Sequence, residues 1–149
     1  GPDFRSWLDV RRTRSAQVIV VDSSAILAIA LAEVEAPHFS QVLAAEEYAF
    51  GWPTILETNM VLFGRSATMQ SFITDFLAYQ SARPVAFSQQ HYAIAIHAFE
   101  KYGKGRHPAQ LNYGDCMAYA VAVEMDAPLL FKSGDFARTD VKVHPASAV

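Results

Sequence analysis

Four acidic side chains have the types and positions needed to bind a divalent cation together. Asp22 directly follows a β-branched run, and Asp115 lies where the chain enters a helix rich in small apolar residues. Asp135 follows an apolar run, and Glu57 lies within an apolar helical segment. Carboxylates that share a site repel one another unless a proton or a cation neutralises them. With no cysteine cluster and no His-x-x-x-His pair, such a set selects a hard ion, Mg²⁺ or Mn²⁺.

Three of these acids also have an ordinary structural explanation. Asp22 could compensate a helix dipole beside an N-cap formed by Ser23 or Ser24. Asp115 could sit in the first turn of a helix whose N-cap is Asn112. A Gly-Asp pair is common in turns, so a turn role could explain Asp135. The coincidence of several acids in the same region therefore carries more weight than any single one.

Glu57 is the acid that is hardest to place on the surface. On a helix it shares a face with Met60 and Val61, and a carboxylate that faces the core is costly unless it is paired or bound to metal. The alternative is an outward side chain near Asn59 and Arg65. We expect the inward orientation.

Strand-like and helix-like segments alternate along the chain. The run 17–21 is β-branched without interruption, as in strands buried on both faces. The predicted strands are 17–21, 48–52, 83–87 and 128–131, with 141–143 as a candidate fifth. The predicted helices are 25–33, 38–47, 54–63, 69–80, 89–102 and 112–125. This alternation predicts a three-layer α/β/α sandwich around a parallel sheet of four to five strands, whose ligands bind beyond the carboxyl ends of the strands.

Size and composition indicate one domain. The chain has 149 residues, of which 52% are hydrophobic and 18% charged. We assign residues 17–149 to this domain, Gly1-Pro2 to a tag remnant and residues 3–16, with four arginines, to an extension. No apolar run reaches the roughly 18 to 20 residues that cross a bilayer. No secretion signal opens the chain, and the single cysteine, Cys116, fits a reducing cytoplasm.

Net charge discriminates weakly between functions. The formal charge of −3 and the pI near 5.9 disfavour a protein that holds nucleic acid by a basic surface. They do not exclude an enzyme that acts on it, because bound cations can make an acidic pocket attractive to phosphate.

Four motifs in order resemble those of the PIN-domain ribonucleases, and in particular the VapC toxins of bacterial toxin–antitoxin pairs. The similarity extends over about residues 17–145, and the loop Gly105-Arg106-His107-Pro108-Ala109 resembles one VapC subgroup. The motifs are Val20-Val21-Asp22-Ser23-Ser24-Ala25, Leu56-Glu57-Thr58, Asn112-Tyr113-Gly114-Asp115-Cys116-Met117-Ala118-Tyr119-Ala120 and Lys132-Ser133-Gly134-Asp135-Phe136.

The resemblance implies an endoribonuclease that uses Mg²⁺ or Mn²⁺, forms homodimers and is inhibited by a cognate VapB-type antitoxin. Asp22, Glu57 and Asp115 match the family's metal-site acids. Asp135 and Asp140 both qualify as the fourth, because the family's last acid varies in position. The arm before residue 17 departs from the family pattern, in which the first strand nearly opens the chain.

This resemblance and the acids together suggest a mechanism. Asp22, Asp115 and Asp135 would bind one or two metal ions, and Glu57 would be a further ligand or would hold the attacking water. Metal lowers the pKa of water and offsets the charge that develops on the phosphate during in-line displacement. The RNA that is cut, the cleavage position and the number of ions are not encoded in any pattern that we can identify.

Three further side chains are candidates for contacts with substrate or water. Ser24 and Thr139 could orient metal-bound waters through their hydroxyls, although capping and turn roles also fit them. Arg106 could contact a phosphate, because its loop directly precedes Asp115, or it could be a solvated loop charge. His107, which precedes a proline, has the pattern of a loop-packing residue.

Rival functions make predictions that the sequence can test. A phosphoacceptor domain would suit Lys132, but it needs an acid pair after the first strand and an acceptor aspartate after the third, where Phe87 is followed by Ser88. A phosphatase of the haloacid-dehalogenase type would have a second aspartate two residues after Asp22, where Ser24 stands. An inactive PIN-like binding domain remains as a third alternative, and a Mn²⁺-dependent cleavage assay with a chelator control separates it from an enzyme.

Overall fold

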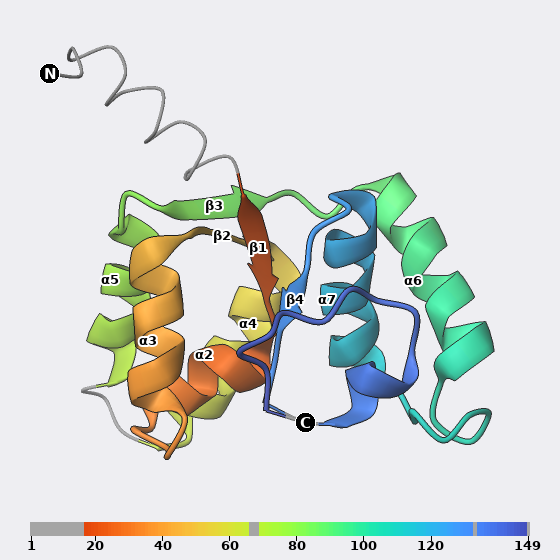
Figure 1. Cartoon of the computed structure of the whole chain (residues 1–149), viewed down its shortest axis with the longest axis horizontal. Helices are drawn as coiled ribbons and strands as arrows, with labels where there is room; N and C mark the ends of the chain where they lie inside the picture. The colour runs from red at the N-terminus through yellow and green to blue at the C-terminus, as the bar shows by residue number, and fades with distance from the viewer. Residues whose placement is uncertain (1–16, 66–68, 133, 149) are drawn as a thin grey trace, which may run out of the picture.

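A four-stranded parallel sheet forms the centre of the molecule (Figure 1). The computed structural model describes residues 17–65, 69–132 and 134–148, so the predicted tag remnant and extension at 1–16 lie outside the described residues. The strands run in the order β3-β2-β1-β4. Their bounds are Val18–Val21 for β1, Glu47–Gly51 for β2, Ala82–Val85 for β3 and Leu129–Leu130 for β4.

Helices cover both faces of the sheet, which confirms the predicted three-layer sandwich. In Figure 1, α3 and α5 lie to the left of the sheet and α6 and α7 to the right. The bounds are Ser23–Ala30 for α2, Ala36–Ala45 for α3, Trp52–Phe63 for α4, Gln70–Ala78 for α5, Gln89–Tyr102 for α6 and Tyr113–Glu124 for α7. A 3-10 helix, η2, spans Gly134–Arg138.

Successive side chains of β1 point to opposite faces of the sheet and pack in two separate parts of the core. Ile19 and Val21 pack with α2, α3, α4 and α5, whereas Val20 packs with α6 and α7. All three side chains are 1% exposed. The run of apolar residues in β1 is uninterrupted because both faces of the strand are buried, as predicted.

Most predicted boundaries differ from the structure by one to three residues, and the larger disagreement is the candidate fifth strand. The segment 141–143 is not a strand: it meets the sheet through a single parallel bridge between Leu129 and Val143. Its backbone bonds converge on this one position, since Leu129 N–H donates to Lys142 O and His144 N–H donates to Leu129 O. At the other side, β2 ends before Trp52 and α4 starts there, because a proline at 53 suits the first turn of a helix.

The carboxyl ends of β1 and β4 meet at one edge of the sheet. The two strands pair in parallel, and the N–H of Asp22 donates to Leu130 O at 3.0 Å. Asp22 and Lys132 therefore follow neighbouring strands at this edge. Among the helices that the structure describes, none is long and apolar enough to cross a membrane.

Candidate active site

Asp22 is the N-cap of α2. Its backbone is extended, and its Oδ2 accepts hydrogen bonds from Ser24 N at 3.0 Å and from Ser24 Oγ at 2.6 Å. The prediction that Ser23 or Ser24 would provide the cap was wrong, because both serines lie inside the helix. Asp22, one or two residues earlier, accepts the free backbone amide of Ser24 instead.

The second oxygen of Asp22 has no such partner. The side chain is 3% exposed, and Oδ1 is buried without a hydrogen-bond donor among the described residues. Burial raises the pKa of Asp22 to about 7, the Ser24 bonds oppose this, and the charges of Asp115 and Glu57 raise it further. An unsatisfied buried carboxylate oxygen is costly in a folded protein. The site therefore has capacity for a cation.

Asp115 combines a structural role with a perturbed charge. It forms a capping box with Asn112: Asp115 N donates to Asn112 Oδ1 at 2.9 Å, and Asn112 N donates to Asp115 Oδ2 at 3.0 Å. Burial nevertheless raises the pKa of Asp115 to about 6, against the Asn112 bond, and the charges of Asp135 and Glu57 add to the rise. The capping box therefore holds the Asp115 carboxylate in place but supplies no positive charge to neutralise it.

Glu57 lies against the start of α7. A Cβ added to Gly114 would come 2.6 Å from Glu57 Cδ, so the glutamate occupies space that only glycine leaves open. Glu57 was expected to point inward because it shares a helix face with Met60 and Val61, and this reason was wrong, because those side chains are 66% and 40% exposed. Glu57 is half-buried at the boundary between α4 and α7, not aimed at the core.

The two candidates for the fourth acid are in different environments. Asp135 is exposed in η2, and its charge raises the pKa of Asp115. Asp140 instead accepts a hydrogen bond from Tyr119 Oη at 2.5 Å, which lowers the pKa of Asp140. It also lines a separate cavity with Lys142. Of these two candidates, only Asp135 acts electrostatically on Asp115.

These contacts define an acid site of Asp22, Glu57, Asp115 and Asp135. The charges of Asp115 and Glu57 act on Asp22, and those of Asp135 and Glu57 act on Asp115. No three His, Cys, Asp or Glu side chains in the described ranges already form a metal-binding group. The donor set consists of carboxylates and includes a buried oxygen without a partner. Such a set fits Mg²⁺ or Mn²⁺, which are hard ions that keep several waters.

Thr139 and Arg106 have ordinary structural contacts. Thr139 Oγ1 donates to Phe136 O at 2.7 Å and accepts from Val141 N at 3.2 Å, which is a turn role. The exposed Arg106 guanidinium lies 5.6 Å from the centroid of the Phe99 ring. Neither contact aims the side chain at the acid site.

Ser24 and Lys132 connect the acid site to the end of β4. Lys132 N donates to Ser24 Oγ at 3.0 Å, and the same hydroxyl donates to Asp22. The Lys132 ammonium pairs with Glu33 and, at 3.3 Å, with Glu35. No sequence pattern indicated these ion pairs, because the partners lie almost 100 positions apart.

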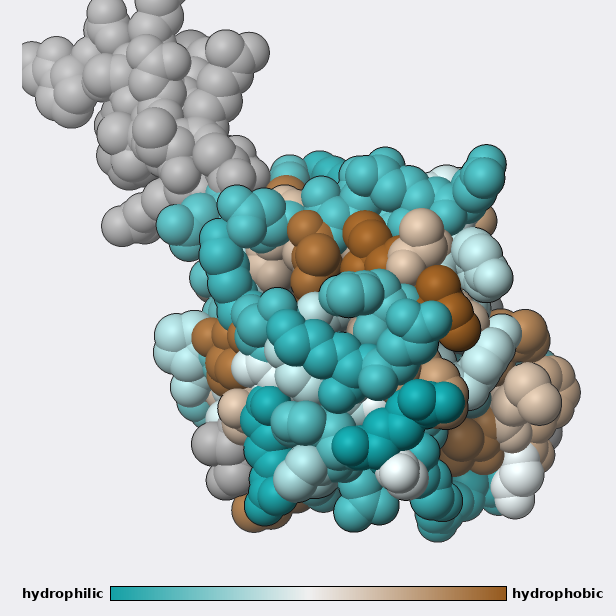
Figure 2. Space-filling model, turned by 90° about the vertical axis from the view of Figure 1, so that its right-hand side faces the viewer, coloured by the Kyte–Doolittle hydropathy of each residue, from teal (hydrophilic) through white to brown (hydrophobic). Residues whose placement is uncertain are grey.

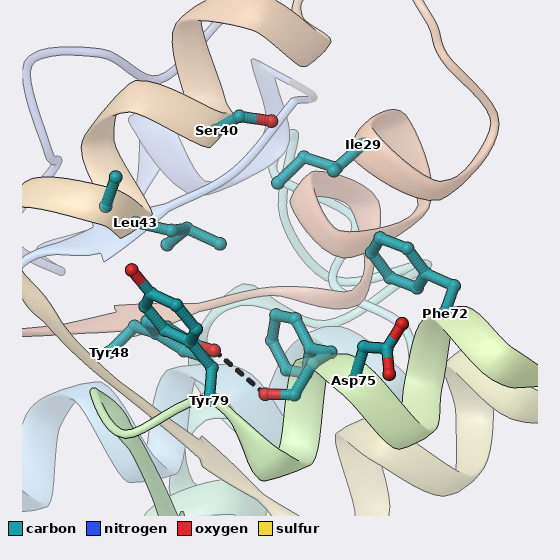
Figure 3. Close-up of a pocket in the computed structure, with 9 residues that line it drawn as sticks. Ile29, Ser40, Leu43, Tyr48, Phe72, Asp75 and Tyr79 are labelled. Carbon is teal, nitrogen blue, oxygen red and sulfur yellow. Dashed lines mark hydrogen bonds between the residues drawn. The ribbon is translucent and has the colours of Figure 1, made fainter.

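A groove between α3 and α5 is lined mainly by apolar side chains (Figure 3). Its volume is about 250 Å³. At its floor, Tyr48 Oη donates to Phe76 O at 2.8 Å, and the Tyr48 ring stacks on Tyr79 with centroids 6.5 Å apart. The lining residues are Ile29, Ser40, Leu43, Ala44, Tyr48, Phe72, Asp75, Phe76 and Tyr79.

A second apolar surface covers the outer side of α6 and the start of α7. In Figure 2, brown side chains interrupt the otherwise hydrophilic face that α6 presents. Tyr113 is 77% exposed and Tyr92 is 61% exposed. On α4, which packs on α7, Leu56 and Met60 are exposed to similar extents. A cavity of about 260 Å³ in this surface is lined by Tyr92, Ala95, Ile96, Phe99, Tyr113, Cys116 and Met117.

Comparisons with known sequences give relatives along most of the chain. A family model described as PIN domain matches residues 19–142. Ribonuclease VapC36 of Mycobacterium tuberculosis is 39% identical over 129 residues, which cover 83% of this chain and 91% of that protein. A ribonuclease VapC of Mycolicibacterium smegmatis is 36% identical over 125 residues, covering 83% of this chain and 97% of that protein.

Solved structures show the same fold at low identity. VapC20 of Mycobacterium tuberculosis, described as a Sarcin-Ricin loop cleaving toxin, matches with a TM-score of 0.69 and 13% identity, over 83% of this chain and 95% of that chain. VapBC2 of Rickettsia felis, crystallised with a DNA fragment from its promoter, matches with a TM-score of 0.64 and 16% identity, over 85% and 96% of the two chains.

Proposed function

The chain belongs to the PIN-domain family as a ribonuclease of the VapC type, and from this premise we propose that its acid site cleaves RNA with bound Mg²⁺ or Mn²⁺. The observation that carries the proposal is the buried, unpartnered Oδ1 of Asp22, which lies in the electrostatic field of Asp115 and Glu57. A divalent cation would supply both the missing partner and the missing positive charge.

Each acid has a distinct role in this proposal. Asp22, Asp115 and Asp135 hold the metal ion or ions, and Glu57 is a further ligand or holds the attacking water. When bound, the ion lowers the pKa of water and offsets negative charge that develops on the phosphate. No covalent intermediate with the protein is required.

Neighbouring groups restrict how these acids can move. The two Ser24 bonds fix one oxygen of Asp22 and leave the other free, and Asn112 fixes Asp115 in the capping box. Gly114 lets Glu57 approach the start of α7. Because pKa values of about 7 and 6 leave part of the Asp22 and Asp115 population protonated near neutral pH, cation binding must displace protons.

Chelation and substitution of Asp115 test the catalytic proposal. We expect the purified protein to cut RNA with Mn²⁺, to stop when a chelator is added, and to lose cleavage in an Asp115→Asn variant. Asp126→Asn is the matched control, because Asp126 is 82% exposed and pairs with Lys142 on the surface. Full activity of a folded Asp115→Asn variant would contradict the assignment.

A VapB-type antitoxin is the partner that we propose, with the groove between α3 and α5 as its docking place. Structures of related toxins include complexes with their antitoxins. The apolar floor of the groove suits the apolar face of a helix, and Asp75 on its wall suits a basic residue beside it. Phe72→Lys should abolish co-purification with a VapB-type antitoxin that binds the wild type, and should leave RNA cleavage intact.

We also propose a homodimer that buries the apolar surface of α4, α6 and α7. Contiguous exposed apolar side chains on a globular protein commonly mark an interaction surface. Tyr92 and Ile96 lie one helical turn apart on α6, and Tyr113 is exposed at the start of α7. Ile96→Arg should convert a dimer into a monomer in light scattering, whereas a monomeric wild type would contradict the proposal.

The proposed RNA substrate indicates the cellular compartment in which the enzyme acts. An RNA-cutting toxin needs access to cellular RNA, so we propose the bacterial cytoplasm as its location. Sequencing the 5′ ends of RNA fragments after brief expression, with an Asp115→Asn control, would identify the RNA and the cleavage position.

A further inference from the structure

We propose that the Lys132 side chain is a positioning element for the acid site, which holds the end of β4 against α2 through its ion pairs with Glu33 and Glu35. This inference rests on the proposed function, since it concerns the ability of the same site to hold a cation. Lys132 would contact neither RNA nor metal, and would act through Ser24 on Asp22.

The backbone of Lys132 connects directly to the acid site. Its N–H donates to Ser24 Oγ at 3.0 Å, and the single hydroxyl proton of Ser24 goes to Asp22 Oδ2 at 2.6 Å. The direction of both bonds is therefore fixed, from amide to hydroxyl to carboxylate. A shift of the backbone at 132 would change the orientation of the Ser24 hydroxyl and with it the bonding of Asp22.

The side chain of Lys132 contacts the opposite end of the same helix. Glu33 and Glu35 lie in the turn that follows α2, whereas Ser24 lies at its start. Lys132 therefore makes contacts at both ends of α2, through its backbone amide at the start and its ammonium after the end. At that end a cation also interacts favourably with the helix dipole.

The turn after α2 has a defined conformation that presents these glutamates. Ala32 has a positive φ of 53°, and Glu33 N–H donates to Ala28 O at 2.9 Å. Ala36 N–H then donates to Glu33 O at 2.9 Å. The acceptors of the ammonium are thus held by backbone bonds rather than by the ion pair itself.

The charges around the acid site support a positioning role over a direct one. The charges that act on Asp22 and Asp115 are all carboxylates, and Lys132 is not among them. Its ammonium is occupied by the two glutamates, with 30% of the side chain exposed. Partly exposed ion pairs contribute modestly, so we expect an effect of roughly three- to tenfold on cation affinity, below the range for a group that touches a ligand.

Lys132→Met tests the inference with two readouts. In the metal-free protein, hydrogen exchange of the amide at 132 should accelerate by roughly three- to tenfold, because the bond to Ser24 opens more often. The Mn²⁺ dissociation constant, measured by electron paramagnetic resonance, should rise by a similar factor. Lys132→Arg should restore both values. Lys142→Met is the matched control, because the Lys142–Asp126 pair lies on the surface and is 60% and 82% exposed.

The outcomes separate this inference from the proposed function. A Glu33→Gln/Glu35→Gln double variant should match Lys132→Met, and combining all three changes should add nothing, because they remove one unit. Unchanged exchange and unchanged Mn²⁺ affinity in Lys132→Met would overturn the inference, and so would a raised KM for RNA with unchanged Mn²⁺ affinity, which indicates a substrate contact. If the wild type binds no Mn²⁺, the proposed function fails, and the exchange measurement still decides whether the ion pairs fix the backbone.

Discussion

Asp22 and Asp140 are two aspartates of one domain with opposite electrostatic surroundings. Asp22 is buried among like charges, has one oxygen without a donor and has a raised pKa. Asp140 accepts a short hydrogen bond from Tyr119 and has a lowered pKa. Sequence spacing made both candidates for the same site. The difference shows what distinguishes a candidate metal ligand from a structural acid: a carboxylate oxygen without a hydrogen-bond donor, more than the position of the acid along the chain.

The largest effect that we expect distinguishes these two residues by activity. Asp22→Asn should lower kcat/KM for RNA by roughly 100-fold or more, since it removes a ligand charge rather than an outer-shell contact. Asp140→Asn should stay within about twofold of wild type, because an amide oxygen can still accept the Tyr119 bond. Equal losses of kcat/KM in the two variants would contradict the assignment of different roles to Asp22 and Asp140.

The second prediction concerns the fourth acid. Asp135→Asn should lower kcat/KM by roughly 30-fold, a value within the range for a group that tunes a metal site. The reason is its charge, which acts on Asp115. If Asp140→Asn proves the more harmful of the two, the fourth acid has been assigned to the wrong residue.

The stability of the metal-free protein provides a third prediction with a defined sign. The pKa of Asp22 rises from 3.8 to about 7 on folding, so the folded state binds more protons and stability falls as pH increases between these values. A shift of this size sets an upper limit of about 4 kcal/mol. Asp22→Asn should therefore unfold at a higher temperature than wild type at pH 8, and this difference should shrink towards pH 4.

For Asp140 the sign is reversed, which sharpens the comparison. Its lowered pKa contributes stability above its ordinary value, and this contribution is lost as pH falls. Asp140→Asn should thus be slightly less stable than wild type at pH 8. Thermal unfolding of both variants in the presence of a chelator gives the measurement, and a destabilised Asp22→Asn protein at pH 8 would argue against an uncompensated charge at position 22.

The smallest expected effect tests the contact between Glu57 and Gly114. Gly114→Ala should displace the Glu57 carboxylate and lower activity by roughly tenfold, by analogy with a changed outer-shell contact. Gly64→Ala is the control, because the atom nearest to its Cβ is 3.5 Å away, an ordinary contact. Wild-type cleavage by Gly114→Ala would show that the position of Glu57 is not critical.

The fold was predictable because its main signals are local. An uninterrupted β-branched run predicted β1, and the proline at 53 predicted the end of the next strand, although that strand begins and ends one residue earlier than predicted. The segment 141–143 has the composition of a strand, but it meets the sheet at one residue, Leu129. That outcome depends on where the chain runs after η2, which no local pattern records.

The acid site was predictable in its residue types and less so in its contacts. Burial of Asp22 follows from its place after a buried strand, and the capping box of Asp115 from Asn112 three residues earlier. The approach of Glu57 to Gly114 joins two helices that are distant in sequence, and the pairing of Lys132 with Glu33 joins the end of β4 to the turn after α2. Such contacts depend on tertiary packing, and only the structure supplies them.

Binding of Mn²⁺ to the metal-free protein tests the central claim most directly, because it requires neither the RNA nor the antitoxin. Electron paramagnetic resonance of free Mn²⁺ at pH 7.5 would compare wild type, Asp22→Asn and Asp140→Asn. We predict that wild type and Asp140→Asn bind Mn²⁺ with the same affinity and that Asp22→Asn does not bind it measurably. Binding by Asp22→Asn with wild-type affinity would contradict the account.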